Sequence, residues 1–370
     1  MTIEHLWKLR NFQPNDSQRD AILYTDGPLF LTAGPGSGKT RVLLWRTLNL
    51  IVFHGVKPED IFLSTFTEKA ALQLKDGLRT LLGVVTNETG QPFDISKMAL
   101  GTVHSICQSI ITDRRFSEGG VRKHPPLLMD ALSQYFKLYN RRYWTQLCLA
   151  GGFADENIAN TEINDYFIGF ASQSRHNAVS SIIGLFNRFS EESLNPDTCQ
   201  TSDSTLTKML RMYRAYLVDL NSHPLIKQVD FSLLQKLAHD QITCLEEAAS
   251  VYKHVIIDEY QDTNAIQEKI FFSLAKGNKN ICVVGDDDQA LYRFRGATVE
   301  NLVEFEDRCL NAIGVKPKRI DLDINYRSRK HIVDTYTGFI NIADWKKDKP
   351  LSGHYRIHDK NIKAHSTDTQ

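Results

Sequence analysis

The chain has 370 residues, of which 42% are hydrophobic and 24% are charged. This composition is typical of a globular protein and excludes a disordered chain, and at roughly 100 to 200 residues per domain the length predicts two or three domains. Lys and Arg together number 44, as do Asp and Glu, so the formal net charge is zero. The chain lacks the basic excess of proteins that bind nucleic acids by charge alone, so any contact with a polyanion must be local.

The six cysteines are scattered along the chain and include no C-x-x-C pair. This spacing argues against a structural zinc site and a disulfide scaffold, and favours a reducing environment. No apolar run approaches the roughly 18 residues that a membrane-spanning helix requires, and the amino-terminal segment lacks the apolar core of a signal peptide. The sequence therefore predicts a cytoplasmic protein without a membrane partner.

Short apolar runs alternate with helical patterns at the beginning of the chain and again after residue 250. The runs predict buried strands at residues 28–33, 61–64, 254–257 and 281–284. Helices are expected after the first two, over residues 41–52 and 68–82, because their apolar residues recur with helical spacing. Strands that alternate with helices favour an α/β layer built on a parallel sheet.

The middle of the chain has a different pattern, which indicates an all-helical insertion within the α/β domain. Helices are predicted at residues 127–147, 163–172, 204–220 and 231–249. Residues 139–144 (YNRRYW) interleave cations with aromatics, as some nucleic-acid-binding segments do. The favoured interpretation is an amphipathic helix that buries Tyr143 and Trp144 and exposes the arginines.

These patterns predict four segments. Residues 1–105 and 250–328 would form the two parts of one α/β domain, and residues 106–249 the helical insertion subdomain. Residues 329–370 would contain the truncated start of a second domain and a polar tail that frays from residue 352 onward.

Residues 33–40 (AGPGSGKT) follow a predicted strand and precede a predicted helix, which is the context of a phosphate-binding P-loop. Its glycines let backbone N–H groups turn toward phosphate oxygens, and the helix directs its positive end at them. Lys39 would reach the β and γ phosphates, and the Thr40 hydroxyl would bind Mg²⁺. Ala33 stands where the usual pattern begins with Gly, a minor departure. The expected nucleotide-binding residues of this segment are Gly34, Gly36, Ser37, Gly38, Lys39, Thr40 and Arg41.

A second acidic element follows the strand predicted before residue 258. Asp258 at its end would hold Mg²⁺, directly or through water, and Glu259 would orient and deprotonate an attacking water. The P-loop alone does not separate kinases from GTPases or ATPases. Its combination with these two carboxylates favours hydrolysis of a nucleotide that is bound with Mg²⁺.

Residues 255–264 (VIIDEYQDTN) resemble the UvrD/Rep/PcrA family of superfamily 1 DNA helicases, and further segments match that family in order. These segments are residues 14–18, 64–71, 101–105, 229–234, 284–289, 292–297 and 325–328. The resemblance implies a RecA-like P-loop NTPase domain with a parallel sheet that is interrupted by an all-helical insertion subdomain. The segment at 325–328 (NYRS) would be the entry to the family's second motor domain.

The resemblance also implies roles for individual residues. Gln18 would read the adenine edge, Tyr326 would stack on adenine, and Gln289 would report the γ-phosphate to the DNA side. Arg327 would contact the γ-phosphate across the interdomain cleft. The expected catalytic residues are Lys39, Asp258, Glu259, Gln289 and Arg327.

The expected DNA-binding residues are Thr65, Phe66, Thr102, His104, Tyr292 and Phe294. Stacking of aromatic rings on bases suits binding that tolerates any sequence, because every base has a π face. Family members often carry Trp where Phe294 stands and Phe where Val103 stands. Phe294 keeps a ring and should still stack, whereas Val103 puts one apolar DNA contact in question.

The resemblance implies that the chain is the N-terminal ATP-binding half of an ATP-dependent 3′–5′ DNA helicase that acts on single-stranded DNA and on single/double-strand junctions. The residues after Arg327 are too few for a second α/β motor domain, so unwinding would need a second motor domain or a subunit in trans. The alternative is an ATP-gated DNA-binding module without autonomous unwinding. A P-loop kinase is disfavoured because it leaves the DEYQDTN and GDDDQ segments without a role.

Overall fold

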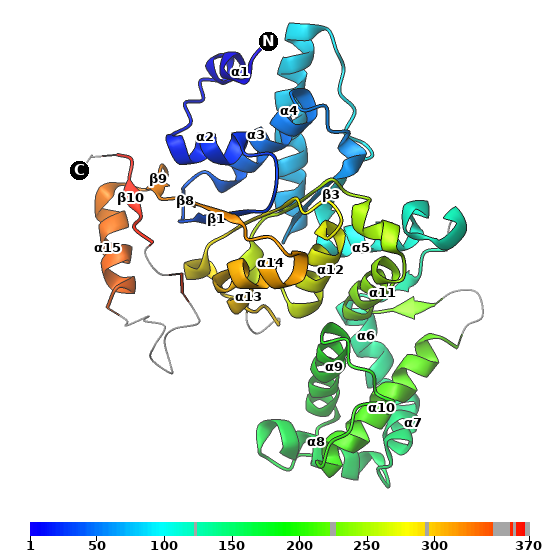
Figure 1. Ribbon diagram of the computed structural model, residues 1–370. Helices are drawn as coiled ribbons and strands as arrows, with labels where there is room; N and C mark the ends of the chain where they lie inside the picture. The colour runs from blue at the N-terminus through cyan, green and yellow to red at the C-terminus, as the bar shows by residue number, and fades with distance from the viewer. Residues whose placement is uncertain (122–123, 223–226, 293–295, 343–355, 358–359, 367–370) are drawn as a thin grey trace. The chain divides into compact units, whose positions relative to one another are not determined.

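The computed structural model describes residues 1–121, 124–222, 227–292, 296–342, 356–357 and 360–366 (Figure 1). Its internal contacts divide the chain into two compact units. One unit joins Met1–Ile106 to Ile242–Gln370, and the other is Cys107–Gln241. The second unit is thus shorter at both ends than the insertion expected at residues 106–249.

The first unit is built on a six-stranded sheet in the order β3-β2-β6-β7-β1-β8. Every neighbouring pair in it is parallel. Its strands are β1 (Leu29–Ala33), β2 (Ile61–Thr65), β3 (Ala99–Thr102), β6 (His254–Ile257), β7 (Ile281–Gly285) and β8 (Lys318–Leu322). The prediction of an α/β fold with a parallel sheet is confirmed, and β3 and β8 extend the four predicted strands at the two edges.

Helices cover both faces of this sheet, with α2, α3 and α4 on one face and α12, α13 and α14 on the other (Figure 1). The helices of this unit are α1 (Ile3–Leu9), α2 (Asp16–Leu23), α3 (Lys39–Val52), α4 (Glu68–Thr89), α12 (Ala265–Ala275), α13 (Glu300–Val303), α14 (Phe305–Ile313) and α15 (Lys330–Ile340). Helix α5 (Val103–Thr112) begins in this unit and ends in the other.

Successive side chains of β1 divide the core between the two faces, as the period of two in a strand requires. Leu29 and Leu31 belong to the apolar cluster that contains residues of α3 and α4. Phe30 points the other way, and its ring centroid lies 5.3 Å from that of Phe305 in α14. All five residues of the strand are buried, which is why its sequence is apolar at every position except Thr32 rather than alternating between apolar and polar residues.

The second unit is helical, apart from the short parallel pair of β4 (Leu127–Leu128) and β5 (Gln228–Val229). Its helices are α6 (Ala131–Tyr139), α7 (Arg141–Gly151), α8 (Glu156–Ile168), α9 (Arg175–Glu191), α10 (Ser204–Leu220) and α11 (Phe231–Thr243), the last of which ends just beyond the unit. The single helix predicted at 127–147 was wrong. Asn140 interrupts it, because its side chain caps α7 by accepting a hydrogen bond from the Tyr143 N–H at 3.2 Å.

The favoured interpretation of the aromatic and basic segment at residues 139–144 is confirmed for Trp144 and in part for Tyr143, which is half-buried, although Asn140 divides the segment between α6 and α7. Trp144 is fully buried, and its indole N–H donates to Asn160 Oδ1 at 2.9 Å. The Tyr143 hydroxyl donates to Asp219 at 3.0 Å, whereas Arg141 is exposed. The Trp144 ring therefore belongs to the core of this unit, and the Tyr143 ring lies at the edge of that core.

The described part of the tail contains a strand that the sequence did not predict. β10 (Lys363–Ala364) pairs in parallel with β9 (Ile324–Asn325), and α15 lies between them in the chain. The expectation of a frayed tail from residue 352 is therefore wrong for these residues. Among the described residues, no helix has the length and apolarity needed to cross a membrane.

Asp230 connects three elements of the helical unit through its buried carboxylate. Its Oδ2 accepts hydrogen bonds from Gln134 at 3.1 Å and from the Tyr216 hydroxyl at 2.9 Å. Its Oδ1 accepts from the Leu233 N–H at 2.7 Å, at the beginning of α11. Burial raises the pKa of Asp230 in spite of these donors. Truncation would leave buried donors without an acceptor, which is costly.

We expect Asp230→Ala to lower the free energy of unfolding by about 2–4 kcal/mol, because each orphaned buried group costs about 1–3 kcal/mol. Urea unfolding monitored by circular dichroism measures this loss. Asp197→Ala is the matched control, since Asp197 forms a solvent-exposed pair with Arg214 that contributes at most about 1 kcal/mol. Equal losses for the two variants would contradict the assignment of Asp230 as a structural hub.

Candidate functional site

The P-loop lies between the end of β1 and the first turn of α3, as its sequence predicts. Gly36 has φ 68° and Gly38 has φ 84°, both in the left-handed region that glycine adopts without steric cost. Ser37 between them is 2% exposed, and its hydroxyl makes no hydrogen bond within the described part of the chain. A loop of this shape turns backbone N–H groups toward an anion at the helix N-terminus.

Gln18 lies directly beneath this loop. It is 3% exposed, and its amide nitrogen donates to the Ser37 carbonyl at 3.0 Å. Its side-chain oxygen accepts from the Asn15 N–H at 3.3 Å, while Asn15 caps α2 through the Gln18 N–H. One of the two amide hydrogens of Gln18 satisfies the P-loop, so the other is the donor that the predicted contact with adenine would use.

The acidic pair at the end of β6 faces the P-loop lysine. The Lys39 ammonium donates to Glu259 Oε2 at 3.0 Å, and their side chains are 11% and 31% exposed. Glu259 adopts a left-handed backbone with φ 52°, an uncommon conformation for a residue with a Cβ that recurs at functional sites. Asp258 beside it is 5% exposed, and its N–H donates to the Ser64 carbonyl of β2 at 2.8 Å.

The pKa of Asp258 is raised by its burial and by the neighbouring charge of Glu259, while Lys39 acts in the opposite direction. A buried carboxylate with these neighbours is stabilised in its ionised form by an additional cation. Thr40, whose hydroxyl is predicted to bind the same Mg²⁺ as Asp258, is exposed. One hydroxyl and one carboxylate fit Mg²⁺, which binds to few protein ligands and completes its shell with water and phosphate oxygens. No group of three or more His, Cys, Asp or Glu in the described residues forms a metal cage.

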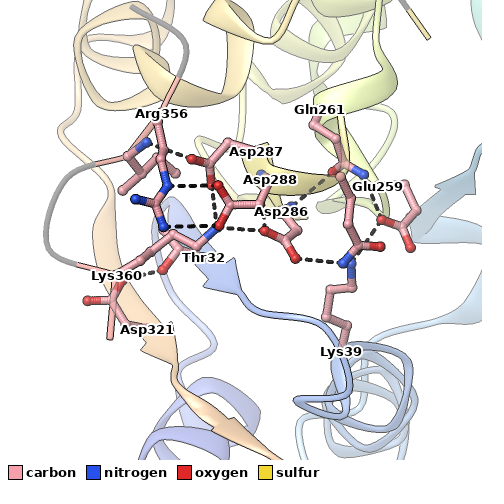
Figure 2. Close-up of polar contacts among 12 residues, drawn as sticks. Thr32, Lys39, Glu259, Gln261, Asp286, Asp287, Asp288, Asp321, Arg356 and Lys360 are labelled. Atoms are coloured by element: carbon pink, nitrogen blue, oxygen red, sulfur yellow. Dashed lines mark hydrogen bonds and ion pairs between the residues drawn. The ribbon is translucent and has the colours of Figure 1, made fainter. Parts of the chain in front are cut away.

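A hydrogen-bonded chain runs from Lys39 toward the loop after β7 (Figure 2). Glu259 Oε2 also accepts from Gln261 Nε2 at 2.9 Å, and Gln261 Oε1 accepts from the Asp286 N–H at 3.0 Å. The Asp286 carboxylate then accepts from Gln289 Nε2 at 2.6 Å. The side chain predicted to report the γ-phosphate is thus connected to the P-loop lysine through Gln261 and Asp286.

The segment predicted to enter a second motor domain rests on the P-loop. The Asn325 amide donates to the Pro35 carbonyl at 2.7 Å, and the Tyr326 N–H donates to the Gly36 carbonyl at 2.9 Å. A Cβ at Gly36 would collide with Asn325 Oδ1 and with Cβ of Arg327. Tyr326 is 42% exposed, and its hydroxyl accepts a hydrogen bond from Asn15 at 3.0 Å. Tyr326 and Arg327 therefore lie beside the loop that they are predicted to serve.

Other predicted nucleotide contacts differ in their surroundings. Arg41 is exposed, and its guanidinium lies 5.2 Å from the centre of the Phe12 ring. This cation–π position directs the guanidinium at the ring. Gly34 is buried at the end of β1, and its N–H donates to the Leu322 carbonyl at 3.4 Å.

The predicted DNA-binding residues form one aromatic pair and several separate contacts. The rings of Phe66 and Tyr292 lie 4.7 Å apart at an interplanar angle of 34°, although the two residues are far apart in sequence. Thr65 is 1% exposed, so its side chain is inaccessible to a DNA strand in this conformation. Phe294 lies outside the described residues.

Thr102 and His104 lie where β3 passes into α5. The Thr102 hydroxyl is within 3.3 Å of Ser105 Oγ, and it also accepts from the Ser105 N–H at 3.3 Å. Burial lowers the pKa of His104, which favours the neutral ring. At this position the protein would therefore offer a hydroxyl and a neutral imidazole rather than positive charge.

Sequence reasoning assigned no role to four residues that complete this region: Gln261, Asp262, Asn325 and Lys360. Gln261 and Asp262 lie within the matched segment DEYQDTN, and Asn325 begins NYRS, so each stood in a recognised motif without a role of its own. Lys360 carried no sequence signal, because it lies in a polar segment without periodicity.

Asp262 introduces a pH dependence into the stability of the site. It is 8% exposed, and one carboxylate oxygen makes no hydrogen bond within the described residues. Burial, followed by the charge of Glu259, raises its pKa to about 7, while Lys39 acts in the opposite direction. The folded state therefore holds a proton that the unfolded chain releases, and this contribution to stability is lost as pH rises from about 4 through 7.

We expect Asp262→Asn to remove this dependence. The unaltered chain should lose unfolding free energy between pH 5 and pH 8 through this carboxyl, and the variant should not. The difference between the two losses should be on the order of a few kcal/mol, because one pKa unit corresponds to about 1.4 kcal/mol. Urea unfolding at both pH values measures the gain. Asp334→Asn is the control, since Asp334 is paired with Lys330 on the exposed face of α15. Parallel pH profiles for Asp262→Asn and the unaltered chain would contradict the prediction.

Comparison with known proteins assigns this site to a family. Residues 14–309 match the model of the UvrD/REP helicase N-terminal domain. The chain is 31% identical over 355 residues to the ATP-dependent DNA helicase SRS2 of Saccharomyces cerevisiae, with 89% of this chain and 27% of that protein covered. It is 29% identical over 340 residues to the ATP-dependent DNA helicase PcrA of Bacillus subtilis, with coverages of 91% and 40%.

The PcrA protein of Staphylococcus epidermidis is 28% identical over 340 residues, with coverages of 91% and 41%. This chain therefore spans less than half the length of each of these relatives. The family match extends from residue 14 to residue 309, within α14, and includes Gln18, the P-loop, the acidic strand end and the loop that carries Gln289. The chain belongs to the UvrD/REP helicase family and contains its N-terminal domain.

Proposed function

We propose that this chain is the ATP-binding and ATP-hydrolysing part of a 3′–5′ DNA helicase. The observation that carries the proposal is the ion pair between Lys39 and Glu259, which joins the P-loop to the acidic end of β6. Its continuation through Gln261 to Asp286 and Gln289 adds the element that would respond to the γ-phosphate. The names of the relatives, ATP-dependent DNA helicases, agree with this chemistry.

In the proposed mechanism, nucleotide binding rearranges the Lys39–Glu259 pair. Phosphate oxygens replace Glu259 as the partner of the Lys39 ammonium, since both offer negative charge at the same cation. The released Glu259 carboxylate is then free to accept a proton from the attacking water. The pair therefore holds the base inactive until a phosphate occupies the loop.

Thr40 and Asp258 would hold Mg²⁺, which supplies charge neutralisation at the β and γ phosphates. The backbone N–H groups of the P-loop orient the phosphates. Arg327 would approach the γ-phosphate from the segment resting on Gly36, and Tyr326 and Gln18 would hold the adenine. Single-stranded DNA and single/double-strand junctions are the proposed substrates, with Phe66 and Tyr292 as a stacking platform.

Because this chain spans less than half the length of its relatives, we propose that strand separation uses a second motor domain, in the same protein or in trans. The alternative function is an ATP-gated DNA-binding module without autonomous unwinding. Measurement of DNA-stimulated ATP hydrolysis and of strand displacement by the 370-residue chain separates the two. Robust displacement by this chain alone would exclude the module.

Lys39→Ala should weaken binding of Mg²⁺–ATP by about tenfold to a hundredfold, because a hydrogen bond to a charged group contributes about 1.5–3 kcal/mol. Equilibrium titration with a fluorescent ATP analogue measures the affinity. The control is Lys269→Ala, an exposed lysine on α12, which should leave it unchanged. Unaltered binding by the Lys39 variant would refute the assignment of the site.

Phe66→Ala and Tyr292→Ala should each weaken binding of single-stranded DNA, since the loss of one base–aromatic stack costs about 1–3 kcal/mol. Fluorescence anisotropy with a labelled oligonucleotide of mixed sequence measures the change. Phe339→Ala, which removes a ring that is 74% exposed on α15, provides the control. If all three variants bind like the unaltered chain, the aromatic pair is not the DNA platform.

A further inference from the structure

Three successive carboxylates lie in the loop that follows β7. Asp286 is fully buried and Asp287 is 6% exposed, and Asp288 is partly buried next to them. Adjacent buried charges of one sign repel each other, and burial removes the water that would screen them. This loop therefore needs a nearby cation to keep its conformation.

The cation is Lys360, which lies in the described part of the tail. Its ammonium nitrogen is 2.6 Å from Asp286 Oδ1, 2.6 Å from Asp287 Oδ1 and 3.0 Å from Asp288 Oδ2. A lysine ammonium has three N–H donors, and here there is one carboxylate for each. The Lys360 side chain is only 3% exposed, so water cannot replace these contacts.

Two further groups of the tail complete the contact (Figure 2). Arg356 Nε donates to Asp288 Oδ1 at 2.8 Å, and the Ile357 N–H donates to Asp287 Oδ2 at 2.7 Å. Burial alone would lower the pKa of Lys360, but the three carboxylates outweigh it and raise the pKa above its ordinary value. The lysine is therefore charged at neutral pH.

Asp286 connects this contact to the nucleotide site. One of its oxygens accepts from Lys360, and the other accepts from Gln289 Nε2 at 2.6 Å. Its backbone N–H donates to Gln261, which continues to Glu259. Lys360 and Gln289 thus share one carboxylate, so the position of the ammonium determines where Asp286 holds the Gln289 amide.

The pairing of β10 with β9 brings Lys360 to this place. Lys363 pairs with Ile324 and Ala364 with Asn325, and Lys360 lies three residues before the start of this strand. Ile362 packs so closely on the P-loop that a Cβ at Gly34 would collide with it. The tail therefore contacts both the phosphate-binding loop and the acidic loop, and β9 leads directly into Tyr326 and Arg327.

We propose that Lys360 is a positioning residue for the nucleotide site, which holds the acidic loop through its three carboxylates and thereby sets the orientation of Gln289. The proposal rests on the proposed function, in which Gln289 responds to the γ-phosphate. It implies that loss of the ammonium weakens the binding of nucleotides that carry a γ-phosphate. Binding of ADP should be unchanged, because ADP does not reach Gln289. A purely structural lysine would change both affinities together.

The test compares Lys360→Met with Lys360→Arg and with Lys363→Met, the last a matched control at an exposed lysine of the same segment. For each variant we measure the dissociation constants of Mg²⁺–ADP and of a non-hydrolysable Mg²⁺–ATP analogue, together with the rate of ATP turnover. Lys360→Met should weaken binding of the analogue on the order of tenfold, as expected for a misplaced contact group. It should change the dissociation constant of Mg²⁺–ADP by no more than about twofold. Lys360→Arg should retain most of the affinity, and Lys363→Met all of it.

A double variant keeps the test decisive if Lys360→Met alone fails to fold. Lys360→Met combined with Asp287→Asn removes one of the repelling charges and leaves an acceptor for the Ile357 N–H, so it should recover folding and part of the affinity for the ATP analogue. Equal effects on ADP and the analogue, or no effect on either, would overturn the proposal. If Lys39→Ala also leaves binding unchanged, the proposed function itself fails. If Lys39→Ala weakens binding while Lys360→Met does not, only the role of Lys360 is excluded.

Discussion

The site depends on one constraint of a parallel sheet, which is that all strands deliver their carboxyl ends to the same edge. In the order β6-β7-β1, three adjacent strands end beside one another. The P-loop follows β1, the Asp258–Glu259 pair follows β6, and the three-aspartate loop follows β7. The Lys39–Glu259 ion pair closes this arrangement, since it joins the loop after β1 to the turn after β6 across the end of the intervening strand.

This arrangement concentrates charge at one edge of a chain that has none in excess. Burial raises the pKa of Asp258 and of Asp262, and Glu259 adds its repulsion to both. Such groups reduce the stability of the folded state, because desolvation of a carboxylate is only partly offset by one lysine. The proposed binding of Mg²⁺ and phosphate would offset this cost, because the metal ion would add the positive charge that these carboxylates lack.

The last described residues of the chain also lie at this edge of the sheet. β9 and its partner β10 place Asn325 and Ile362 against the P-loop, while Lys360 lies among the aspartates after β7. Any rearrangement of the β9–β10 pair must therefore change contacts at both loops together. A hydrogen-bonded chain from Lys360 through Asp286 to Gln289 is a physical route for such coupling, and the variants of Lys360 measure it.

Local sequence determined the P-loop, the acidic strand end and the four central strands, because glycines with required backbone angles and continuously apolar runs depend on near neighbours in the chain. It could not place edge strand β8 or the break at Asn140, where mixed polarity or a side-chain cap outweighs the periodic pattern. It recognised the Gln289 segment but could not show that its amide rests on Asp286. Only the tertiary structure decided the pairing of Phe66 with Tyr292 and the position of Lys360, since each joins residues remote in sequence that the order of the strands brings together.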